Sequence, residues 1–242
     1  MSTQNRFLII AAIVGAVGES AVLRSAMPQA AIRNPPSAIR NGSWQTLFDG
    51  KSLDAWRGYK SQTMPAGWRI EGGALVKDDR VPDIITKDQF GDFELELEWK
   101  IGDASNSGVF YRGTAEFNQI YWSAPEYQLL DNVNAADNKK DNHLAGSVYD
   151  LYAAPKDAAR PANEWNQTRI LAKGNHVEHW LNGKKVASYD VGSADWNAAI
   201  KASKFDPQKY PNFGKAAKGY LGIQGDHPGT LELRNIRIRE LQ

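Results

Sequence analysis

The stretch DFELELEWKI, residues 92–101, decides the fold class of this chain. Large apolar residues occupy every second position from Phe93 to Ile101, and charged residues fill the positions between them. Because successive side chains of a β-strand point to opposite faces, this pattern predicts a strand with one face in a core. We interpret the other face, with Glu94, Glu96 and Glu98, as a solvated outer surface.

The composition fits an all-β protein. The chain has 242 residues, with 8 Trp, 9 Tyr and 21 Gly, and few long helical patterns, so one β-sandwich domain can use its whole length. A formal net charge of +1 gives no electrostatic drive toward nucleic acid or an anionic membrane. Cysteine is absent, which excludes disulfides, thiolate metal sites and a cysteine nucleophile.

Two further strands are expected next in the chain, at 108–112 and 125–130. Alternation places Arg112 on one face of the first, and Glu126 and Gln128 together on one face of the second. If these faces coincide, a cation, a carboxylate and an amide can reach one ligand; the alternative is an Arg–Glu pair on a wet surface. Aromatic neighbours favour a sugar-binding surface: Phe110, Tyr111, Tyr121 and Trp122.

The N-terminus has the pattern of an export signal. Arg6 is followed by an apolar run, residues 7–18, that is too short to span a bilayer. We therefore expect a signal peptide at 1–30, a flexible leader at 31–43 and a single domain at 44–242. The product is expected to be periplasmic or secreted, with no membrane attachment after signal removal.

Turns, a long loop, a short helix and a bulge are expected in the rest of the domain. Gly72-Gly73 and Asn182-Gly183 each predict a tight hairpin. A polar loop at 132–147 is long enough to lie over a binding face. A short helix is expected around 196–203, and a change of side-chain parity at Asn235 predicts a bulge in the last strand.

Acids and histidines are the candidates for chemistry. Glu126 can act as acid, base or ligand, whereas Asp131 also suits a turn. His143 and His227 lie in loops beside acidic residues, which suits a base or metal ligand, while the spacing around His179 favours a core histidine. No HxH or HExxH spacing supports a metal, and serine-hydrolase, P-loop and dinucleotide motifs are absent.

Several motifs together resemble one family. WQTLFDGKSLDAW, NSGVFYRG, PEYQLLDN, EWNQTRI, HWLNGKKV, PNFGKAAKGYLGIQ and LELRNIRIREL are similar to the 3-keto-disaccharide hydrolase domain family over about residues 44–242. The resemblance implies a concanavalin- or laminin-G-like β-jelly roll of two antiparallel sheets with little helix, in an exported bacterial protein acting on sugars with a ketone at C3. The family's Gln-Asp-His-Gly appears here with an insertion, as Gln224 to Gly229, which puts the role of His227 in doubt.

The resemblance also implies chemistry. A C3 ketone acidifies the C2 proton, so abstraction of that proton, elimination at C1 and hydration give net hydrolysis. We assign His143 or His179 as base, Arg112 as enolate stabiliser with a possible divalent metal, and Glu126 as acid or metal ligand, with Asp131 as a further acidic candidate. The residues expected to bind substrate are Asn106, Gln128, Tyr149, Trp165, Gln224 and His227.

Two other functions stay open. One is a carbohydrate-binding jelly roll without catalysis, and the other is an ordinary glucanase on the same fold, although its two carboxylates on one strand are not matched by Glu126 and Gln128. For the enzyme, the expected partners are a carbohydrate and a separate sugar 3-oxidoreductase, because this chain carries no nicotinamide or flavin motif.

Overall fold

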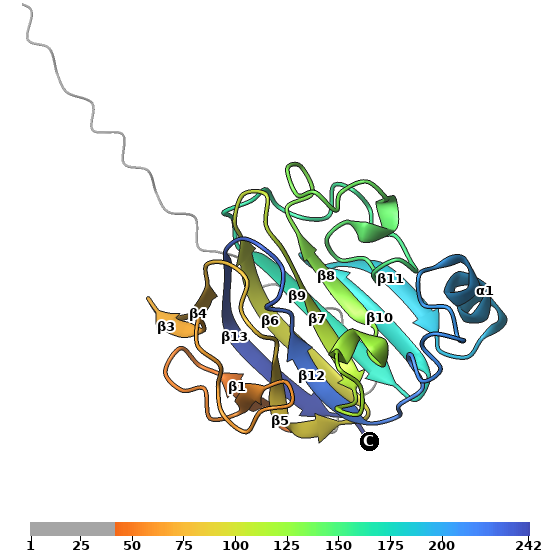
Figure 1. The fold of residues 1–242 in the computed structure, drawn as a ribbon, viewed down its shortest axis with the longest axis horizontal. Helices are drawn as coiled ribbons and strands as arrows, with labels where there is room; N and C mark the ends of the chain where they lie inside the picture. The colour runs from red at the N-terminus through yellow and green to blue at the C-terminus, as the bar shows by residue number, and fades with distance from the viewer. Residues whose placement is uncertain (1–41) are drawn as a thin grey trace, which may run out of the picture. The chain divides into compact units, whose positions relative to one another are not determined.

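The computed structural model describes residues 42–242, which form a sandwich of two antiparallel sheets (Figure 1). The predicted all-β sandwich is confirmed. The expected signal peptide, and the expected leader up to residue 41, fall outside the described residues and stay predictions. In the described part of the chain, no helix has the length and apolar character needed to cross a membrane.

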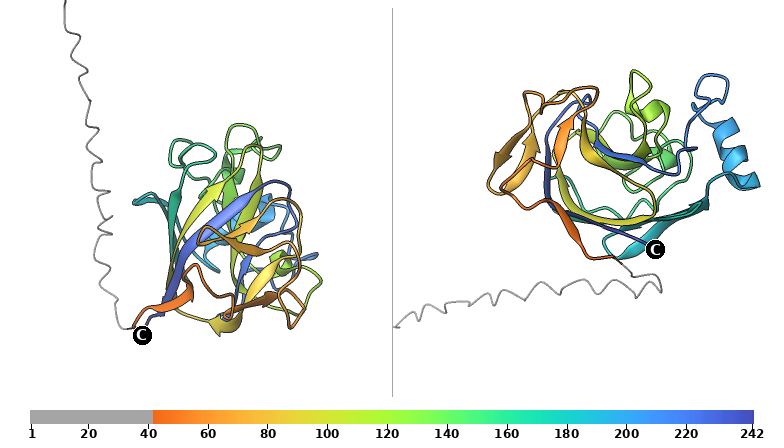
Figure 2. Two further views of the ribbon diagram at one scale, coloured as in Figure 1. Left: turned by 90° about the vertical axis from the view of Figure 1, so that its left-hand side faces the viewer. Right: turned by 90° about the horizontal axis from the view of Figure 1, so that it is seen from below.

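The larger sheet has eight strands and the smaller has five. Figure 2 shows the sandwich from two further sides. The larger follows the order β11 (Lys184–Asp190), β10 (His176–Leu181), β9 (Asn166–Lys173), β6 (Phe93–Ile101), β13 (Leu231–Glu240), β4 (Ala74–Lys77) and β3 (Arg69–Glu71), with β1 (Gln45–Phe48) also paired to β13. The smaller follows the order β2 (Trp56–Gly58), β5 (Ile84–Phe90), β12 (Gly219–Ile223), β7 (Asn106–Gly113) and β8 (Glu126–Leu130).

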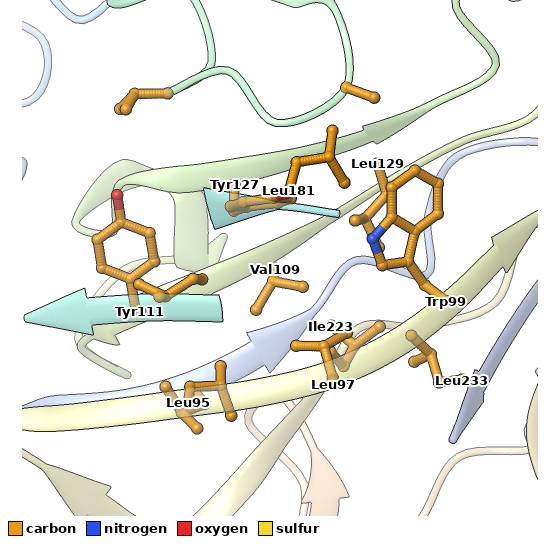
Figure 3. Close-up of a cluster of buried hydrophobic side chains, with 14 of the residues drawn as sticks. Leu95, Leu97, Trp99, Val109, Tyr111, Tyr127, Leu129, Leu181, Ile223 and Leu233 are labelled. Atoms are coloured by element: carbon orange, nitrogen blue, oxygen red, sulfur yellow. The ribbon is translucent and has the colours of Figure 1, made fainter. Parts of the chain in front are cut away.

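The core lies between the two sheets and is built on β6, as its alternation predicts. Its apolar positions, Phe93 to Ile101, are each at most 2% exposed. They face the apolar positions of the smaller sheet, where Val109 and Tyr111 of β7 lie close to Tyr127 of β8 (Figure 3). This packing determines which face of β7 and β8 lies against the core. The opposite face can therefore carry functional residues.

The outer face of β6 is not the solvated acidic surface expected from sequence. Its glutamates lie opposite arginines of β13, and Glu98 pairs with Arg234 at 2.7 Å. Glu94 is only 1% exposed and lies between Arg169 and Arg239, with which it forms ion pairs. Glu94 is buried because two arginines neutralise it, a long-range pairing that the pattern of one strand does not reveal.

The predicted hairpins, bulge and short helix are confirmed. The Gly72-Gly73 and Asn182-Gly183 pairs adopt positive φ and join β3 to β4 and β10 to β11. A register shift with positive φ at Asn235 bends β13. The helix α1 (Ala194–Ala202) begins at Ser193, whose side chain caps Trp196, and lies at the edge near β11 (Figure 1).

The polar loop after β8 folds back along that strand. It contains the short 3₁₀ helix η2 (Asp141–His143), while another, η1 (Ile120–Trp122), precedes β8. Gly146 N–H donates to the Gln128 carbonyl, and Gln128 N–H donates to the Ser147 carbonyl. The loop is therefore fixed to the open edge of the smaller sheet, beside Glu126.

Candidate active site

The candidate site lies on the face of β7 and β8 that points away from the larger sheet. Phe110 is paired with Glu126, and Gly108 is paired with Gln128. Since Val109 and Tyr127 point into the core, alternation turns Glu126 and Gln128 to the opposite face. The prediction that Glu126 and Gln128 share one face of their strand is therefore confirmed.

Gly108 makes room for the carboxyl group of Glu126. A Cβ atom at position 108 would lie 2.0 Å from Oε1 of Glu126 and 2.7 Å from its Cδ. No side chain fits in that space while the carboxyl group is there. The glycine therefore lets the Glu126 side chain lie flat against the backbone of β7.

Glu126 is a buried acid whose pKa is shifted toward neutrality. It is 5% exposed, and burial raises its pKa to about 8. Nearby Lys204 lowers the pKa, whereas the carboxylates of Asp83, Asp226 and Asp137 raise it. Near neutral pH this group can exist both as a carboxylate that accepts a proton and as an acid that returns one.

Three amide side chains surround this acid. The amide groups of Gln128 and Asn106 lie 3.3 Å apart, and the NH₂ group of Gln128, turned toward acceptors, reaches Oε1 of Glu126 at 3.1 Å. Gln224 N–H donates to the Gly108 carbonyl, which places Gln224 beside the glycine. Its side-chain oxygen is buried with no hydrogen-bond partner among the described residues, so it is available to a substrate hydroxyl.

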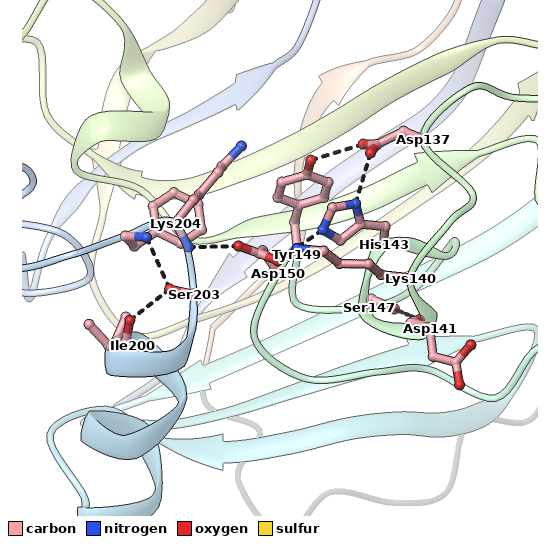
Figure 4. A network of polar contacts seen from close by, with 11 residues as sticks. Asp137, Lys140, Asp141, His143, Ser147, Tyr149, Asp150, Ile200, Ser203 and Lys204 are labelled. Atoms are coloured by element: carbon pink, nitrogen blue, oxygen red, sulfur yellow. Dashed lines mark hydrogen bonds and ion pairs between the residues drawn. The ribbon is translucent and has the colours of Figure 1, made fainter.

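A hydrogen-bonded network supports the site from the loop after β8 (Figure 4). His143 Nδ1 lies 2.8 Å from Asp137, and its Nε2 lies 2.9 Å from Asp150. The Tyr149 hydroxyl donates to Asp137 at 2.9 Å, while its backbone N–H donates to the Glu126 carbonyl at 3.0 Å. Both ring nitrogens of His143 are therefore engaged, which argues against its predicted role as the base and favours a positioning role.

Lys204 and Asp83 are members of the site that the sequence did not indicate. Lys204 follows α1 in a segment interpreted only as an irregular loop, and its ammonium lies 4.3 Å from the centre of the Tyr149 ring. Asp83 directly precedes β5 and accepts hydrogen bonds from the N–H groups of Gly225 and Asp226; burial raises its pKa to about 6. Neither residue stands in a motif with recognisable spacing.

The structure does not bring His179 to this site. Its ring is fully buried between the sheets, where Nδ1 donates to the Gly146 carbonyl at 3.0 Å and Nε2 accepts from the Tyr111 hydroxyl at 2.9 Å. The Tyr111 oxygen lies 2.6 Å from that of Tyr189. The structure therefore does not support the assignment of His179 as a base, and its burial fits a core histidine, as its spacing favours.

The buried histidine predicts a pH dependence of stability. Burial lowers the pKa of His179 from 6.5 to about 4. The unfolded chain therefore takes up a proton here below pH 6.5, and stability that is full above that pH is lost as pH falls through about 4. At about 1.4 kcal/mol per pKa unit, the loss is about 3 kcal/mol.

Urea denaturation at pH 6.5 and pH 4 measures this loss. We expect the free energy of unfolding of a His179→Gln variant to fall less than that of the wild type between these pH values. A His176→Gln variant, altered at a histidine whose side chain is 43% exposed, is the control and should follow the wild type. Equal losses in all three proteins would show that His179 does not carry the effect.

Arg112 also lies away from Glu126. Its guanidinium donates to the carbonyls of Gly91 and Gly174, at 2.9 and 2.7 Å, and pairs with Asp92 at 3.1 Å. Alternation placed Arg112 on the Glu126 face, but its φ of +52° breaks the regular strand geometry at the end of β7. Its predicted role as enolate stabiliser is therefore not supported.

The other predicted residues have mixed outcomes. Asp131 accepts hydrogen bonds from the N–H groups of Ala104 and Val133, which gives it the turn role. Trp165 lies on the outer side of the larger sheet beneath the guanidinium of Arg234, 3.9 Å from the ring centre, and so apart from Glu126. His227 is half-exposed beside Asp226, with Nδ1 at 2.7 Å from its carboxylate.

The divalent metal considered from the sequence has no group of three ligands in the described part of the chain. Between residues 42 and 242, no three His, Asp or Glu side chains are grouped so that they could hold an ion. Zinc sites in proteins use three or four such ligands. The described residues do not form a site of that kind, and we derive no step through a metal.

Comparisons with known proteins match this chain over most of its length. The model of the 3-keto-alpha-glucoside-1,2-lyase-like domain matches residues 43–239. A 3-keto-disaccharide hydrolase from Bacteroides thetaiotaomicron is 35% identical over 226 residues, covering 81% of this chain and 78% of that protein. The aligned region includes most of the sandwich.

Solved structures extend the comparison. A candidate glycosyl hydrolase from Parabacteroides distasonis is 30% identical, with a TM-score of 0.76 over 82% of this chain and 94% of that chain. A non-specific endo-β-1,3(4)-glucanase of family GH16 has a TM-score of 0.53 at 10% identity, over 86% of this chain and 95% of that one. The second likeness shows the jelly-roll fold alone.

Proposed function

Because this chain belongs to the 3-keto-alpha-glucoside-1,2-lyase-like domain family, we propose that it is an enzyme that cleaves the glycosidic bond of 3-keto glycosides, including 3-keto disaccharides. One observation carries the proposal. The carboxyl group of Glu126 is buried beside amide side chains, on the face of the smaller sheet that points away from the larger sheet. Its pKa is raised to about 8. A base of this strength suits removal of a proton next to a ketone.

The reaction uses the acidity that the ketone gives to C2. The C2–H bond breaks, its electron pair forms the C2–C3 double bond of an enolate, and the proton passes to Glu126. The enolate then expels the glycosidic oxygen from C1, and the aglycone takes up a proton as it leaves. Water adds to C1 of the resulting enone and a proton returns to C2, so the balance is hydrolysis.

The surrounding side chains hold the sugar. We assign Asn106 to hydrogen bonds with hydroxyl or ketone oxygens, and the unpartnered oxygen of Gln224 to a substrate hydroxyl. Gln128 is fully buried and its NH₂ group donates to Glu126, so it holds the acid in place rather than the sugar. Tyr149 and His143 hold the loop against β8 through Asp137. These groups position the substrate, so that Glu126 alone acts on the C2 proton.

The chemistry also implies a supply and a place. The substrate ketone has to be made by a separate sugar 3-oxidoreductase, since the chain has no nicotinamide or flavin motif. The signal-like residues 1–30 favour export, and we propose a periplasmic or secreted bacterial enzyme. Cell fractionation with an antibody to the protein tests the location.

The test of function compares a 3-keto disaccharide with its unoxidised parent by NMR. Each sugar is incubated with purified protein, and the anomeric signals are followed in time. We expect cleavage of the keto sugar only. Equal cleavage of both sugars would indicate an ordinary glycosidase, and binding without cleavage of either would indicate a carbohydrate-binding module.

A further inference from the structure

The proposed reaction needs positive charge near the substrate ketone, and Arg112 does not supply it. Proton abstraction turns the ketone oxygen into an enolate oxygen, whose developing negative charge an enzyme stabilises with a fixed donor. The charges that shift the pKa of Glu126 include three carboxylates, Asp83, Asp137 and Asp226, and one cation, Lys204. Because the other charges near Glu126 are negative, stabilisation of the enolate depends on where Lys204 lies.

Aromatic rings hold the ammonium group of Lys204. Its Nζ lies 4.3 Å from the centre of the Tyr149 ring, 5.3 Å from that of Phe205 and 5.5 Å from that of Tyr121. Contacts of this kind attract a cation without cancelling its charge. Within residues 42–242, no carboxylate forms an ion pair with Lys204, so its charge stays available to an anion.

The backbone of Lys204 is tied to the loop network. Its N–H donates to Oδ2 of Asp150 at 2.7 Å, and Oδ1 of Asp150 lies 2.9 Å from Nε2 of His143 (Figure 4). The Asp150 side chain is 4% exposed. Asp150 therefore connects the segment after α1 to the loop after β8, and it fixes where Lys204 leaves the backbone.

Lys204 and Glu126 lie on the same face of the smaller sheet. Tyr149, whose ring carries the ammonium, donates its backbone N–H to the Glu126 carbonyl. Tyr121, the most distant of the three rings, packs on the cluster around Phe110, the residue paired with Glu126 across β7 and β8. Lys204 is an exposed residue, so its ammonium is accessible to a ligand, and the three rings and the bond from its backbone to Asp150 restrict where it lies.

We propose that Lys204 is a catalytic residue whose ammonium donates a hydrogen bond to the C3 oxygen of the substrate and stabilises the enolate. Lys204 keeps its proton throughout, and the C2 proton goes to Glu126. The electron pair of the C2–H bond forms the C2–C3 double bond, and the π electron pair of the ketone moves onto the C3 oxygen. Asp150 and His143 are positioning residues for the ammonium. The inference rests on the proposed function and adds a residue to it.

The test compares Lys204→Met with Lys204→Arg, and with Lys201→Met as a matched control on the exposed side of α1. We expect kcat on the 3-keto disaccharide to fall about 10- to 100-fold in Lys204→Met, with KM changed less than about threefold. Lys204→Arg should recover most of the loss, and Lys201→Met should match the wild type. Thermal denaturation checks that each variant is folded.

The pH profile adds a readout that a structural role would not move. The charged and titratable groups that act electrostatically on Glu126 include Lys204, Asp83, Asp137, Asp226 and Tyr149, and Lys204 is the one cation among these five. Loss of its charge favours the protonated acid, so the acidic limb of kcat/KM should move to higher pH in Lys204→Met. It should stay in place in Lys204→Arg.

Titration of the free protein separates this inference from the proposed function. ¹³C NMR of labelled glutamate follows the Glu126 carboxyl group without substrate, and its midpoint should rise in Lys204→Met. An unchanged midpoint, or wild-type kcat in a folded Lys204→Met protein, would overturn the role of Lys204. Failure of the wild type to cleave any keto sugar would instead overturn the proposed function.

Discussion

A Glu126→Gln variant is expected to turn over a 3-keto disaccharide about 1,000-fold more slowly than the wild type. Glutamine has nearly the same shape and can accept hydrogen bonds, but it cannot take up the C2 proton. KM should change little, because the neighbouring amides that bind the sugar remain. Steady-state kinetics with the purified protein measures the loss.

The same variant should be folded and at least as stable. Glu126 is buried, and burial already favours its uncharged form. Replacing it by a neutral amide therefore removes a desolvation cost. A folded Glu126→Gln protein with wild-type turnover would exclude this residue as the base.

A Gly108→Ala variant is expected to lose more than about 100-fold in kcat without any change in the acid itself. The new Cβ would lie 2.0 Å from Oε1 of Glu126, so the carboxyl group has to leave its position. Displacing a catalytic group by about 1 Å can cost about 100-fold. Kinetics and the crystal structure of the variant together measure the loss and the displacement.

Gly91→Ala is the matched control for this substitution. Its φ is not in the left-handed region, and the nearest atom to a Cβ at position 91 is the Ala217 carbonyl oxygen at 3.4 Å. An alanine there makes an ordinary contact, so full activity is expected. Loss of activity in both variants would point to a general effect of replacing a glycine rather than to the position of Glu126.

The fold could be predicted because its information is local. Strict alternation in β6 fixes a buried face, and the pairs Gly72-Gly73 and Asn182-Gly183 set hairpins through their own backbone preferences. The exception is Glu94. Its burial depends on Arg169 and Arg239, which lie on strands far along the chain, and no pattern within β6 contains them.

The centre of the site could also be predicted. Glu126 and Gln128 share a face through alternation on one short strand, and β7 pairs antiparallel with that strand. Arg112 did not follow, because a single positive φ redirects a side chain and periodicity assumes regular backbone. The residue before the end of a strand is where that assumption is weakest.

The supporting network could not be predicted. Lys204 meets Tyr149 and Asp150 only through tertiary packing, across more than 50 positions of sequence. His143 stood out as a loop histidine beside acids, and those acids are what now engage both its nitrogens. A sequence shows that such groups exist, but only the fold shows which of their atoms are left free.

The carboxylate arrangement distinguishes the proposed chemistry from that of ordinary glycosidases. Those enzymes flank the bond with two carboxyl groups, one acid and one base or nucleophile. Here β8 presents Glu126, while the side chain of Asp131 is bound to the N–H groups of Ala104 and Val133. Asp83, the other acid here with a raised pKa, accepts hydrogen bonds from the N–H groups of Gly225 and Asp226, which leaves Glu126 to remove the proton next to the ketone.

The central claim is that the enzyme removes and replaces the proton at C2. The most direct measurement is turnover of a 3-keto disaccharide in D₂O, with the released sugar examined by ¹H NMR at early times and a sample without enzyme as control. The account predicts that the released keto sugar carries deuterium at C2 and that Glu126→Gln suppresses its appearance. Release of a sugar that keeps its original C2 proton would contradict the account.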